Sequence, residues 1–412
     1  GDPGNDPPTE LVSFRNLYRQ TLPWGQANPE GDRGLTFYGG DLPGICQHLD
    51  HMERLGVNAI YLNPLFTAIS NHRYDGLDYL NVDPVLGGNA ALVQLRQGLD
   101  ERKMHYLMDI VPNHCGYMHP WFQKAREDKD SLEAGFFYFD EHPDDYASWM
   151  GHKGVPKLNY ASRELRQRMF KGEESIIKHW LKPPFSADGW RVDVANMLGR
   201  RNEQLLDKEV IAGVRQAVKS VNPQAYLIGE NFYEASSQLQ GNGWDAVMNY
   251  AAFSGPLWNW LSGVHMDALN WEGKFTSHRP WPTEVLVRTW QEHMASVPWQ
   301  ITCQQFNLLD SHDTGRIRTT VKGNDALHRL AAIIQFTFPG VPCVYYGDEI
   351  GLMDMPGFGS RNCMQWDEGQ WNKPLWNFYR KLIDFRKHSE VLKDGSFRIL
   401  YWEMDFFIYQ RE

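Results

Sequence analysis

Short runs of apolar and β-branched residues alternate along this chain with longer amphipathic segments, and this alternation constrains the fold more than any other feature. The runs lie at 57–66, 104–114, 189–196, 225–231, 244–250, 304–313 and 341–351. Helical periodicity occurs at 42–56, 90–103, 164–182, 208–223, 325–340 and 374–389. Strands separated by helices of this length form parallel βαβ units. The pattern therefore predicts seven parallel strands, in a barrel or a doubly wound sheet.

Acidic residues at the strand ends favour the barrel. Asp109, Asp193, Glu230 and Asp313 lie at or just past the carboxyl ends of four predicted strands. A barrel of this type assembles its active site from the loops at that rim. We therefore expect an α/β fold, a (β/α)₈ TIM barrel, with the active site at the carboxyl ends of its strands.

The segments outside the strand and helix pattern indicate how the chain is divided into domains. Residues 1–36 are rich in Pro, Gly and Asp and predict an irregular start to a first barrel part at 1–114. The stretch 115–163 is too long for an ordinary loop and predicts an inserted subdomain after the third strand. A second barrel part follows at 164–390, and the strand-like alternation within 391–412 predicts the start of a C-terminal β-domain.

The composition of the chain argues against several classes of partner and favours one cellular compartment. The formal net charge of −10, without a basic stretch, argues against nucleic acid as a partner. Five scattered cysteines without CxxC spacing argue against a disulfide framework or a zinc site and favour a cytoplasmic protein. No apolar run is long enough to cross a bilayer, so no membrane partner is expected. The 16 tryptophans are interpreted mainly as core anchors, with sugar stacking as the alternative.

The segment GWRVDVAN places Arg191 and Asp193 two residues apart on a strand, on the same face. An adjacent Arg is expected to lower the pKa of Asp193 and keep it charged, as a nucleophile requires. Glu230 ends the next strand, where a neighbouring anion and partial burial would raise its pKa, as a general acid requires. Gly229 before it would leave room for a ligand. The alternative is a structural ion pair at the rim of the barrel.

Other strand ends offer groups that could hold a sugar. His312 and Asp313 could grip two hydroxyls of one sugar, or could be a buried His beside a capping Asp. His114 is interpreted as a hydroxyl contact or a core histidine, and Asp109 as a structural partner of Arg191. Tyr74, near His72 on a loop, is a stacking platform or a core residue.

In order along the chain, DIVPNH, VPKLNY, GWRVDVAN, GEN, LLDSHDT and GVPCVYYGDEIG resemble the motifs of the α-amylase family of glycoside hydrolases over residues 37–390. VPKLNY and GWRVDVAN resemble the neopullulanase, cyclomaltodextrinase and maltodextrin glucosidase branch. DGWRVDVANMLG, GENFYEASSQLQ and NYAAFSGPLW are most similar to bacterial maltodextrin glucosidase.

The resemblance implies retaining cleavage of α-1,4-glucosidic bonds in short maltodextrins. It makes Asp193 the nucleophile, Glu230 the acid/base and Asp313 the transition-state stabiliser. The residues expected to hold the sugar are Tyr74, His72, His114, Arg191, His312 and Arg361. Alternatives are a neopullulanase or cyclomaltodextrinase, or a catalytically inactive glycan-binding homologue.

Further expectations come from the same likeness. GDPGNDP and FYGGDL resemble a structural calcium site of the branch, with ligands from Asp2, Asn5, Asp6, the Gly39 carbonyl and Asp41.

No cofactor is expected for the chemistry, and the full-length protein is expected to be able to form a homodimer. Family members carry a strand before GDP, so the first barrel strand and the C-terminal β-domain are expected to be truncated here. Gly357 replaces an Asp that the branch usually has four residues before Arg361, which leaves Asp354 as a substitute.

Overall fold

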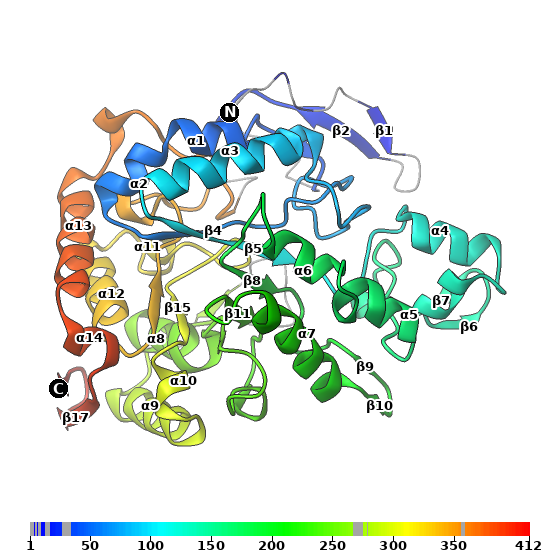
Figure 1. Cartoon of the computed structure of the whole chain (residues 1–412). Coiled ribbons are helices and arrows are strands. Elements are labelled where there is room, and N and C mark those ends of the chain that lie inside the picture. Colours follow the sequence, from blue (N-terminus) through cyan, green and yellow to red (C-terminus); the bar gives the residue numbers. More distant parts are fainter. Residues whose placement is uncertain are drawn as a thin grey trace.

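A computed structural model describes residues 4, 6, 10–12, 17–26, 34–266, 275–277, 279–355 and 359–412 (Figure 1). Five parallel strands form its largest sheet, in the order β12-β11-β8-β5-β4. They are β4 (Ala59–Tyr61), β5 (His105–Ile110), β8 (Gly189–Val192), β11 (Tyr226–Gly229) and β12 (Ala246–Val247). A second parallel pair, β15 (Phe306–Leu308) and β16 (Val341–Cys343), continues this order through a parallel bridge between Met248 and Phe306.

These seven strands follow the order of the sequence around a barrel, as the pattern predicts. They are shorter than the predicted runs, because the residues beyond each strand turn into the loops of the carboxyl rim. No described strand pairs with the outer edges of β4 and β16, so the described strands fill seven of the eight positions of a (β/α)₈ barrel.

Helices cover the outside of the barrel (Figure 1). They are α1 (Leu42–Gln47), α2 (Leu49–Leu55), α3 (Gly88–Glu101), α5 (Arg163–Arg166), α6 (Ile176–Leu181), α7 (Asp207–Val221), α8 (Gly255–Ser262), α9 (Thr283–Ser296), α10 (Trp299–Thr302), α11 (Ile317–Thr320), α12 (Asp325–Thr337), α13 (Lys373–Lys387) and α14 (Glu390–Asp394). The sequence interpretation missed α8 to α11 and α14.

Local signals explain several helix ends. Asp41 caps α1, because its side chain accepts a hydrogen bond from the Gly44 amide at 2.7 Å. Gly56 ends α2 in a left-handed conformation with φ 97°. The predicted helix 164–182 is instead divided into α5, the π-helix η5 (Gln167–Lys171) and α6. A bend between η5 and α6 lets α6 pack on the sheet.

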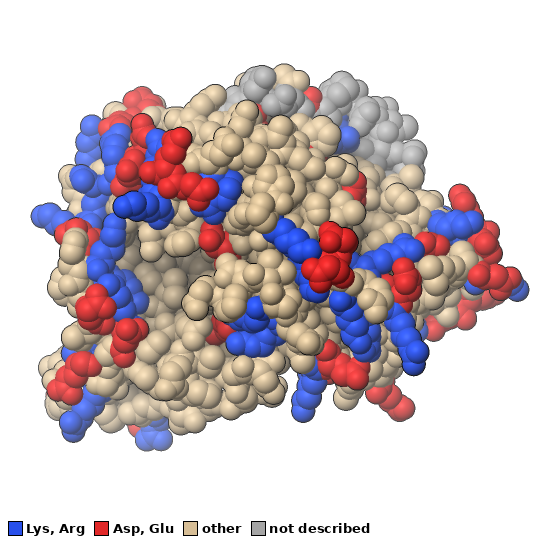
Figure 2. Space-filling view, viewed as in Figure 1, with Lys and Arg blue, Asp and Glu red and all other residues tan. Residues whose placement is uncertain are grey.

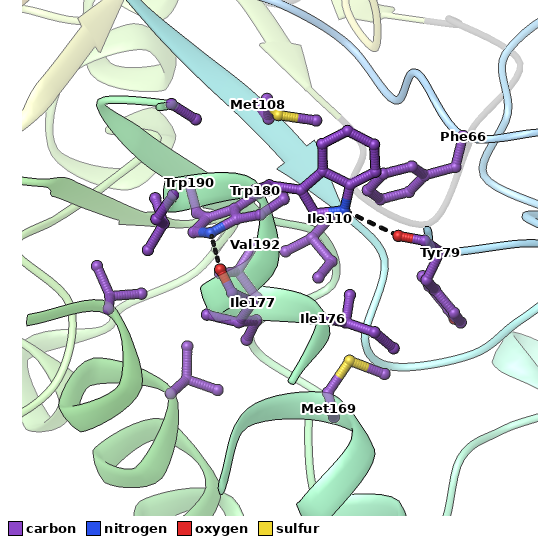
Figure 3. Close-up of a cluster of buried hydrophobic side chains, with 14 of the residues drawn as sticks. Phe66, Tyr79, Met108, Ile110, Met169, Ile176, Ile177, Trp180, Trp190 and Val192 are labelled. Atoms are coloured by element: carbon purple, nitrogen blue, oxygen red, sulfur yellow. Dashed lines mark hydrogen bonds between the residues drawn. The ribbon is translucent and has the colours of Figure 1, made fainter. Parts of the chain in front are cut away.

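The core between α6 and the sheet is built around two tryptophans (Figure 3). Trp180 and Trp190 are fully buried. The Trp190 indole donates a hydrogen bond to the Ile177 carbonyl at 3.2 Å, and the Trp180 indole donates to the Tyr79 carbonyl at 2.8 Å. Because these polar tips are satisfied, the rings act as core anchors. Trp244, Trp258 and Trp290 are also buried, which agrees with the same interpretation for them.

Three peripheral segments complete the fold. In the N-terminal segment, β1 (Glu10–Val12), β2 (Leu17–Thr21) and β3 (Thr36–Phe37) form a small sheet, so the prediction of an irregular start was wrong there. The segment 115–163 projects to one side (Figure 1) and contains α4 (Pro120–Glu127), β6 (Phe139–Glu141) and β7 (Asp145–Tyr146). At the C-terminus, β17 (Phe397–Trp402) and β18 (Phe407–Arg411) form an antiparallel hairpin. Short pairs β9 (Arg200–Arg201) with β10 (Gln204–Leu205), and β13 (Val264–Met266) with β14 (Phe275–Ser277), extend the loops.

Charged side chains are mixed on the surface. Figure 2 shows basic and acidic residues interspersed on one face, without a broad basic area. None of the helices in the described part of the chain is both long enough and apolar enough to cross a membrane.

Candidate active site

The carboxyl ends of β5, β8 and β11 bring three predicted site residues together. Asp109 lies opposite Arg191 in the β5–β8 register, and Ile228 lies opposite Arg191 in the β8–β11 register. Asp193 and Glu230 directly follow β8 and β11. Because side chains alternate along parallel strands, these polar groups point into the same end of the barrel.

Arg191 is the centre of the cluster and is fully buried. Its Nη1 lies 2.8 Å from Asp193 Oδ1 and 3.1 Å from Asp109 Oδ2, and its Nη2 lies 3.0 Å from Glu230 Oε1. One planar guanidinium therefore contacts both carboxylates of the proposed pair, so the two carboxyl groups lie less than about 10 Å apart at one rim. The prediction of Asp109 as a structural partner of Arg191 agrees with these contacts.

The two carboxylates differ in their hydrogen bonds. Glu230 Oε2 accepts a hydrogen bond from the Val194 amide at 2.6 Å, and Glu230 Oε1 forms an ion pair with Arg191. Asp193 Oδ2 is buried and has no hydrogen-bond partner among the described residues. An unengaged carboxylate oxygen is available to attack an electrophile.

Arg191 lowers the pKa of Asp193 as expected, but the expectation that this pKa is low overall was wrong. Burial, and then the charge of Glu230, raise the pKa of Asp193 well above its usual value, against the attraction of Arg191. Removal of the carboxylate from water and its nearness to a second anion outweigh one adjacent cation. Asp193 therefore retains a proton more readily than an isolated carboxyl group would.

The pKa of Asp313 is shifted in the opposite direction, below its usual value. Although burial raises its pKa, the charge and hydrogen bond of His312 and the charge of Arg361 outweigh burial and lower that pKa. His312 Nε2 lies 3.1 Å from Asp313 Oδ2, and Arg361 Nη2 lies 3.2 Å from Asp313 Oδ1. Asp313 is therefore the carboxylate of the cluster that stays ionised.

Tyr74 lies between Asp109 and His312 and contacts both side chains. Its hydroxyl lies 3.1 Å from Asp109 Oδ2 and 2.7 Å from His312 Nε2, and its ring stacks at 5.7 Å from the His312 ring. The Arg191 guanidinium lies 5.8 Å from the same ring. Tyr74 therefore has a fixed orientation between the β8 end and the β15 loop.

The two remaining predicted histidines border the cluster. His72 Nδ1 accepts a hydrogen bond from the Tyr74 amide at 3.1 Å. His114 is buried and lies 3.1 Å from the Asn113 side chain, and burial followed by the charge of Lys157 lowers its pKa to about 3. A neutral imidazole at that position can exchange hydrogen bonds with a sugar hydroxyl.

Sequence reasoning missed Lys157, which joins the inserted segment to the barrel. Its ammonium donates to Asn113 Oδ1 at 2.5 Å and to the Met197 carbonyl at 3.0 Å. Burial lowers the pKa of Lys157 to about 8. The signal was present in VPKLNY, where a lysine lies between apolar residues that pack inside. Tyr61 was also missed, and its hydroxyl donates to Asp109 Oδ2 at 2.9 Å.

The interpretation of Gly229 as room for a ligand was wrong. A Cβ atom at this position would lie 2.6 Å from Nε1 of Trp244, so the glycine leaves room for that indole. Trp244 in turn donates to Gln238 Oε1 at 2.8 Å, and Gln238 Oε1 also accepts from Asn231. The residues on both sides of Glu230 are thus fixed by packing behind the strand.

The expected calcium ligands are only partly described. Asp2 and Asn5 lie outside the described residues, as does Gly357 in the other loop. Asp6 Oδ2 accepts a hydrogen bond from the Gly39 amide at 2.5 Å, and Asp41 Oδ1 caps α1. Within the described ranges, no group of three or more His, Cys, Asp or Glu side chains is arranged to hold a metal ion.

Comparison with known proteins identifies the family. Residues 13–395 match the model of the α-amylase catalytic domain. The chain is 35% identical to a cyclomaltodextrinase from Bacillus sp, and the match covers 94% of this chain and 65% of that protein. It is 34% identical to an intracellular maltogenic amylase from Bacillus subtilis (strain 168), and that match covers 91% of this chain and 59% of that protein. The ligand-free structure of a cyclic α-maltosyl-(1→6)-maltose hydrolase from Arthrobacter globiformis superimposes with a TM-score of 0.83 at 30% identity, over the whole of this chain and 85% of the other.

The chain spans 59% to 66% of the length of the cyclomaltodextrinases and maltogenic amylases that it matches. The match nevertheless extends through both barrel parts and through every strand end that carries a carboxylate of the cluster. The barrel, its buried carboxylate cluster and these matches together show that the chain belongs to the α-amylase family of glycoside hydrolases and, within it, to the branch of cyclomaltodextrinases, maltogenic amylases and neopullulanases.

Proposed function

We propose that the protein hydrolyses α-1,4-glucosidic bonds of short maltodextrins with retention of anomeric configuration. The observation that carries the proposal is the contact of Arg191 with both Asp193 and Glu230 beside the ionised Asp313. Retaining glycosidases need two carboxyl groups on opposite sides of the scissile bond, one as nucleophile and one as acid.

In this proposal Asp193 attacks the anomeric carbon through Oδ2, the oxygen without a hydrogen-bond partner among the described residues. Glu230 protonates the departing oxygen. A covalent glycosyl intermediate on Asp193 results, and Glu230 then takes a proton from the water that releases the sugar. The reaction needs a proton on Glu230 and a negative charge on Asp193.

Asp313 is assigned to stabilise the positive charge that develops on the sugar in the transition state. Its depressed pKa keeps it negative, and its position is fixed by His312 and Arg361. The residues assigned to hold the sugar at the cleavage point are Tyr74, His72, His114, Arg191, His312 and Arg361.

The test is maltotriose hydrolysis by the wild type and by Asp193→Asn. We expect turnover to fall by a factor of about 10⁴ or more, because removal of a nucleophile of this kind has effects of that order. Asp130→Asn, on the exposed surface of the inserted segment, is the matched control and should leave turnover unchanged. Wild-type turnover by Asp193→Asn would refute the assignment. A folded wild type that binds maltotriose without cleaving it would favour the glycan-binding alternative.

A second candidate is cyclomaltodextrinase activity, supported by the names of three of the relatives. Both activities use the same carboxylates and differ in the shape of the surrounding loops. Rates on maltoheptaose and on β-cyclodextrin decide between them. Faster opening of the ring than cleavage of the linear chain favours the cyclomaltodextrinase.

A structural calcium ion is a further part of the proposal. The proposed ligands are the carboxylates of Asp2, Asp6 and Asp41, the Asn5 side chain and the Gly39 carbonyl, because Ca²⁺ prefers hard oxygen donors. Chelation should lower the melting temperature, and an unchanged melting temperature would show that this ligand set is wrong.

We also propose a cytoplasmic location and a homodimer of the full-length protein. All five cysteines are unpaired, which suits a reducing compartment. Cell fractionation tests the location, and sedimentation of the full-length protein tests the dimer.

A further inference from the structure

Ser311 lies two residues before Asp313, in the loop that follows β15, and is almost completely buried. Its Oγ accepts a hydrogen bond from the Asp313 amide at 3.1 Å. Its own amide donates to Thr314 Oγ1 at 2.8 Å, and its carbonyl accepts from Ser360 Oγ at 3.1 Å. The amide, the carbonyl and the hydroxyl of Ser311 are therefore all engaged, and the hydroxyl holds the backbone of Asp313.

Tyr250 reaches the same hydroxyl from a neighbouring element. It begins η7 (Tyr250–Ser254), a π-helix that follows β12, and its hydroxyl lies 2.7 Å from Ser311 Oγ. Tyr250 is fully buried, and burial raises the pKa of its hydroxyl well above the usual value, so the hydroxyl keeps its proton. A serine hydroxyl has one donor and two acceptor positions, so Ser311 Oγ can bond to Tyr250 and to the Asp313 amide at the same time.

The helical face that carries Tyr250 also holds the end of β15. Tyr250, Ser254 and Trp258 follow one another at intervals of four residues through η7 and α8, so they lie on one face. Ser254 Oγ donates to the Leu308 carbonyl at 2.6 Å, and the Trp258 indole donates to the Leu309 carbonyl at 2.6 Å. This face therefore fixes both the strand end and the loop that presents the proposed transition-state stabiliser.

The ring of Tyr250 contacts a second loop of the candidate active site. It stacks on the ring of Phe232, with the centroids 4.4 Å apart and the planes inclined by 7°. Phe232 lies two residues after Glu230. Tyr250 therefore contacts the Glu230 loop through its ring and the Asp313 loop through its hydroxyl, and replacement by phenylalanine would remove only the second contact.

We propose that Tyr250 and Ser311 are positioning residues that fix the backbone of Asp313 and thereby aim its carboxylate. This inference rests on the proposed function, because it concerns the carboxylate assigned to the transition state. His312 and Arg361 contact the carboxyl group itself. Because His312 belongs to the same loop and the Arg361 side chain is partly exposed, the buried bond from Tyr250 adds a rigid anchor from outside the loop. Stabilisation of a developing charge depends on such preorganised placement.

The proposal predicts a loss of kcat that is not additive. Tyr250→Phe should lower kcat on maltotriose by about threefold to tenfold and change KM by less than about twofold, because Asp313 is assigned to the transition state. Ser311→Ala also removes the acceptor of the Asp313 amide and should lower kcat by about tenfold to 100-fold. Because Tyr250 acts through Ser311, kcat of the double variant should lie within about twofold of that of Ser311→Ala.

Tyr379→Phe is the matched control, because Tyr379 is also fully buried and its hydroxyl lies 3.0 Å from His328 Nε2, between α12 and α13. It should keep wild-type kcat even where its melting temperature falls. The comparison of Tyr250→Phe with Tyr379→Phe applies even if Ser311→Ala does not fold.

Three results would overturn the proposal. They are wild-type kcat in Tyr250→Phe, an equal loss of kcat in Tyr379→Phe, and a double variant whose loss is the product of the two single losses. Failure of the proposed function is separate, because it appears as unchanged turnover in Asp193→Asn.

Discussion

Substitution of Gly229 by alanine tests whether Glu230 is positioned by packing behind the barrel. A Cβ atom at residue 229 would lie 2.6, 2.7 and 2.9 Å from Nε1, Cδ1 and Cε2 of Trp244. Ordinary contacts of a carbon atom begin near 3.5 Å, so a displacement of about 0.9 Å is needed. Trp244 is fully buried and its indole nitrogen is bonded to Gln238, so the ring cannot rotate away cheaply.

The expected loss of stability is about 1–3 kcal/mol, the range for overpacking in a close-packed core. If β11 gives way instead of Trp244, the Glu230 carboxyl moves by several tenths of an ångström, and kcat should fall by about 10-fold to 100-fold. The assays are calorimetric melting and maltotriose kinetics. Gly135→Ala is the control, because a Cβ there has no neighbour within 4 Å.

The two interpretations of Gly229 predict different results. If the glycine makes room for a ligand, alanine should raise KM and leave the melting temperature unchanged, and that outcome would refute the packing argument. If it makes room for Trp244, addition of Trp244→Phe should recover part of kcat, because the smaller ring withdraws the atoms that the new methyl group meets.

Two further predictions concern charge. Lys157→Met should destabilise the protein by up to about 3 kcal/mol in chemical denaturation. Two charge-assisted hydrogen bonds, each worth about 1.5–3 kcal/mol, are lost, while the cost of burying the ammonium, about 3 kcal/mol from its pKa of about 8, is relieved. A more stable variant would contradict this balance. Burial raises the pKa of Asp109 to about 6. Folded protein therefore keeps a proton that unfolded protein loses near pH 4, so the contribution of Asp109 to the free energy of unfolding is present at low pH and falls by about 3 kcal/mol as the pH rises to about 6. Asp109→Asn should flatten the pH dependence of the melting temperature over that interval, and parallel curves would show that Asp109 is not its source.

The sequence by itself determined the order of strands and helices and the residues at the strand ends. Short apolar and β-branched runs bounded by polar residues located all seven barrel strands, because burial on both faces of a parallel sheet demands continuous apolar stretches. The motif order identified the family and thereby grouped Asp193, Glu230 and Asp313 before any coordinates were considered. Sequence could not locate the sheet at 10–37, where residues rich in Pro and Gly obscure the pattern.

Only the tertiary structure decided the electrostatics and the supporting contacts. The pKa of Asp193 depends on the charge of Glu230, which is distant in sequence, and on the loss of water around both groups. The partner of Gly229 is a tryptophan fifteen residues away. Such effects depend on distances between segments that fold together, and local residue patterns carry no information about those distances.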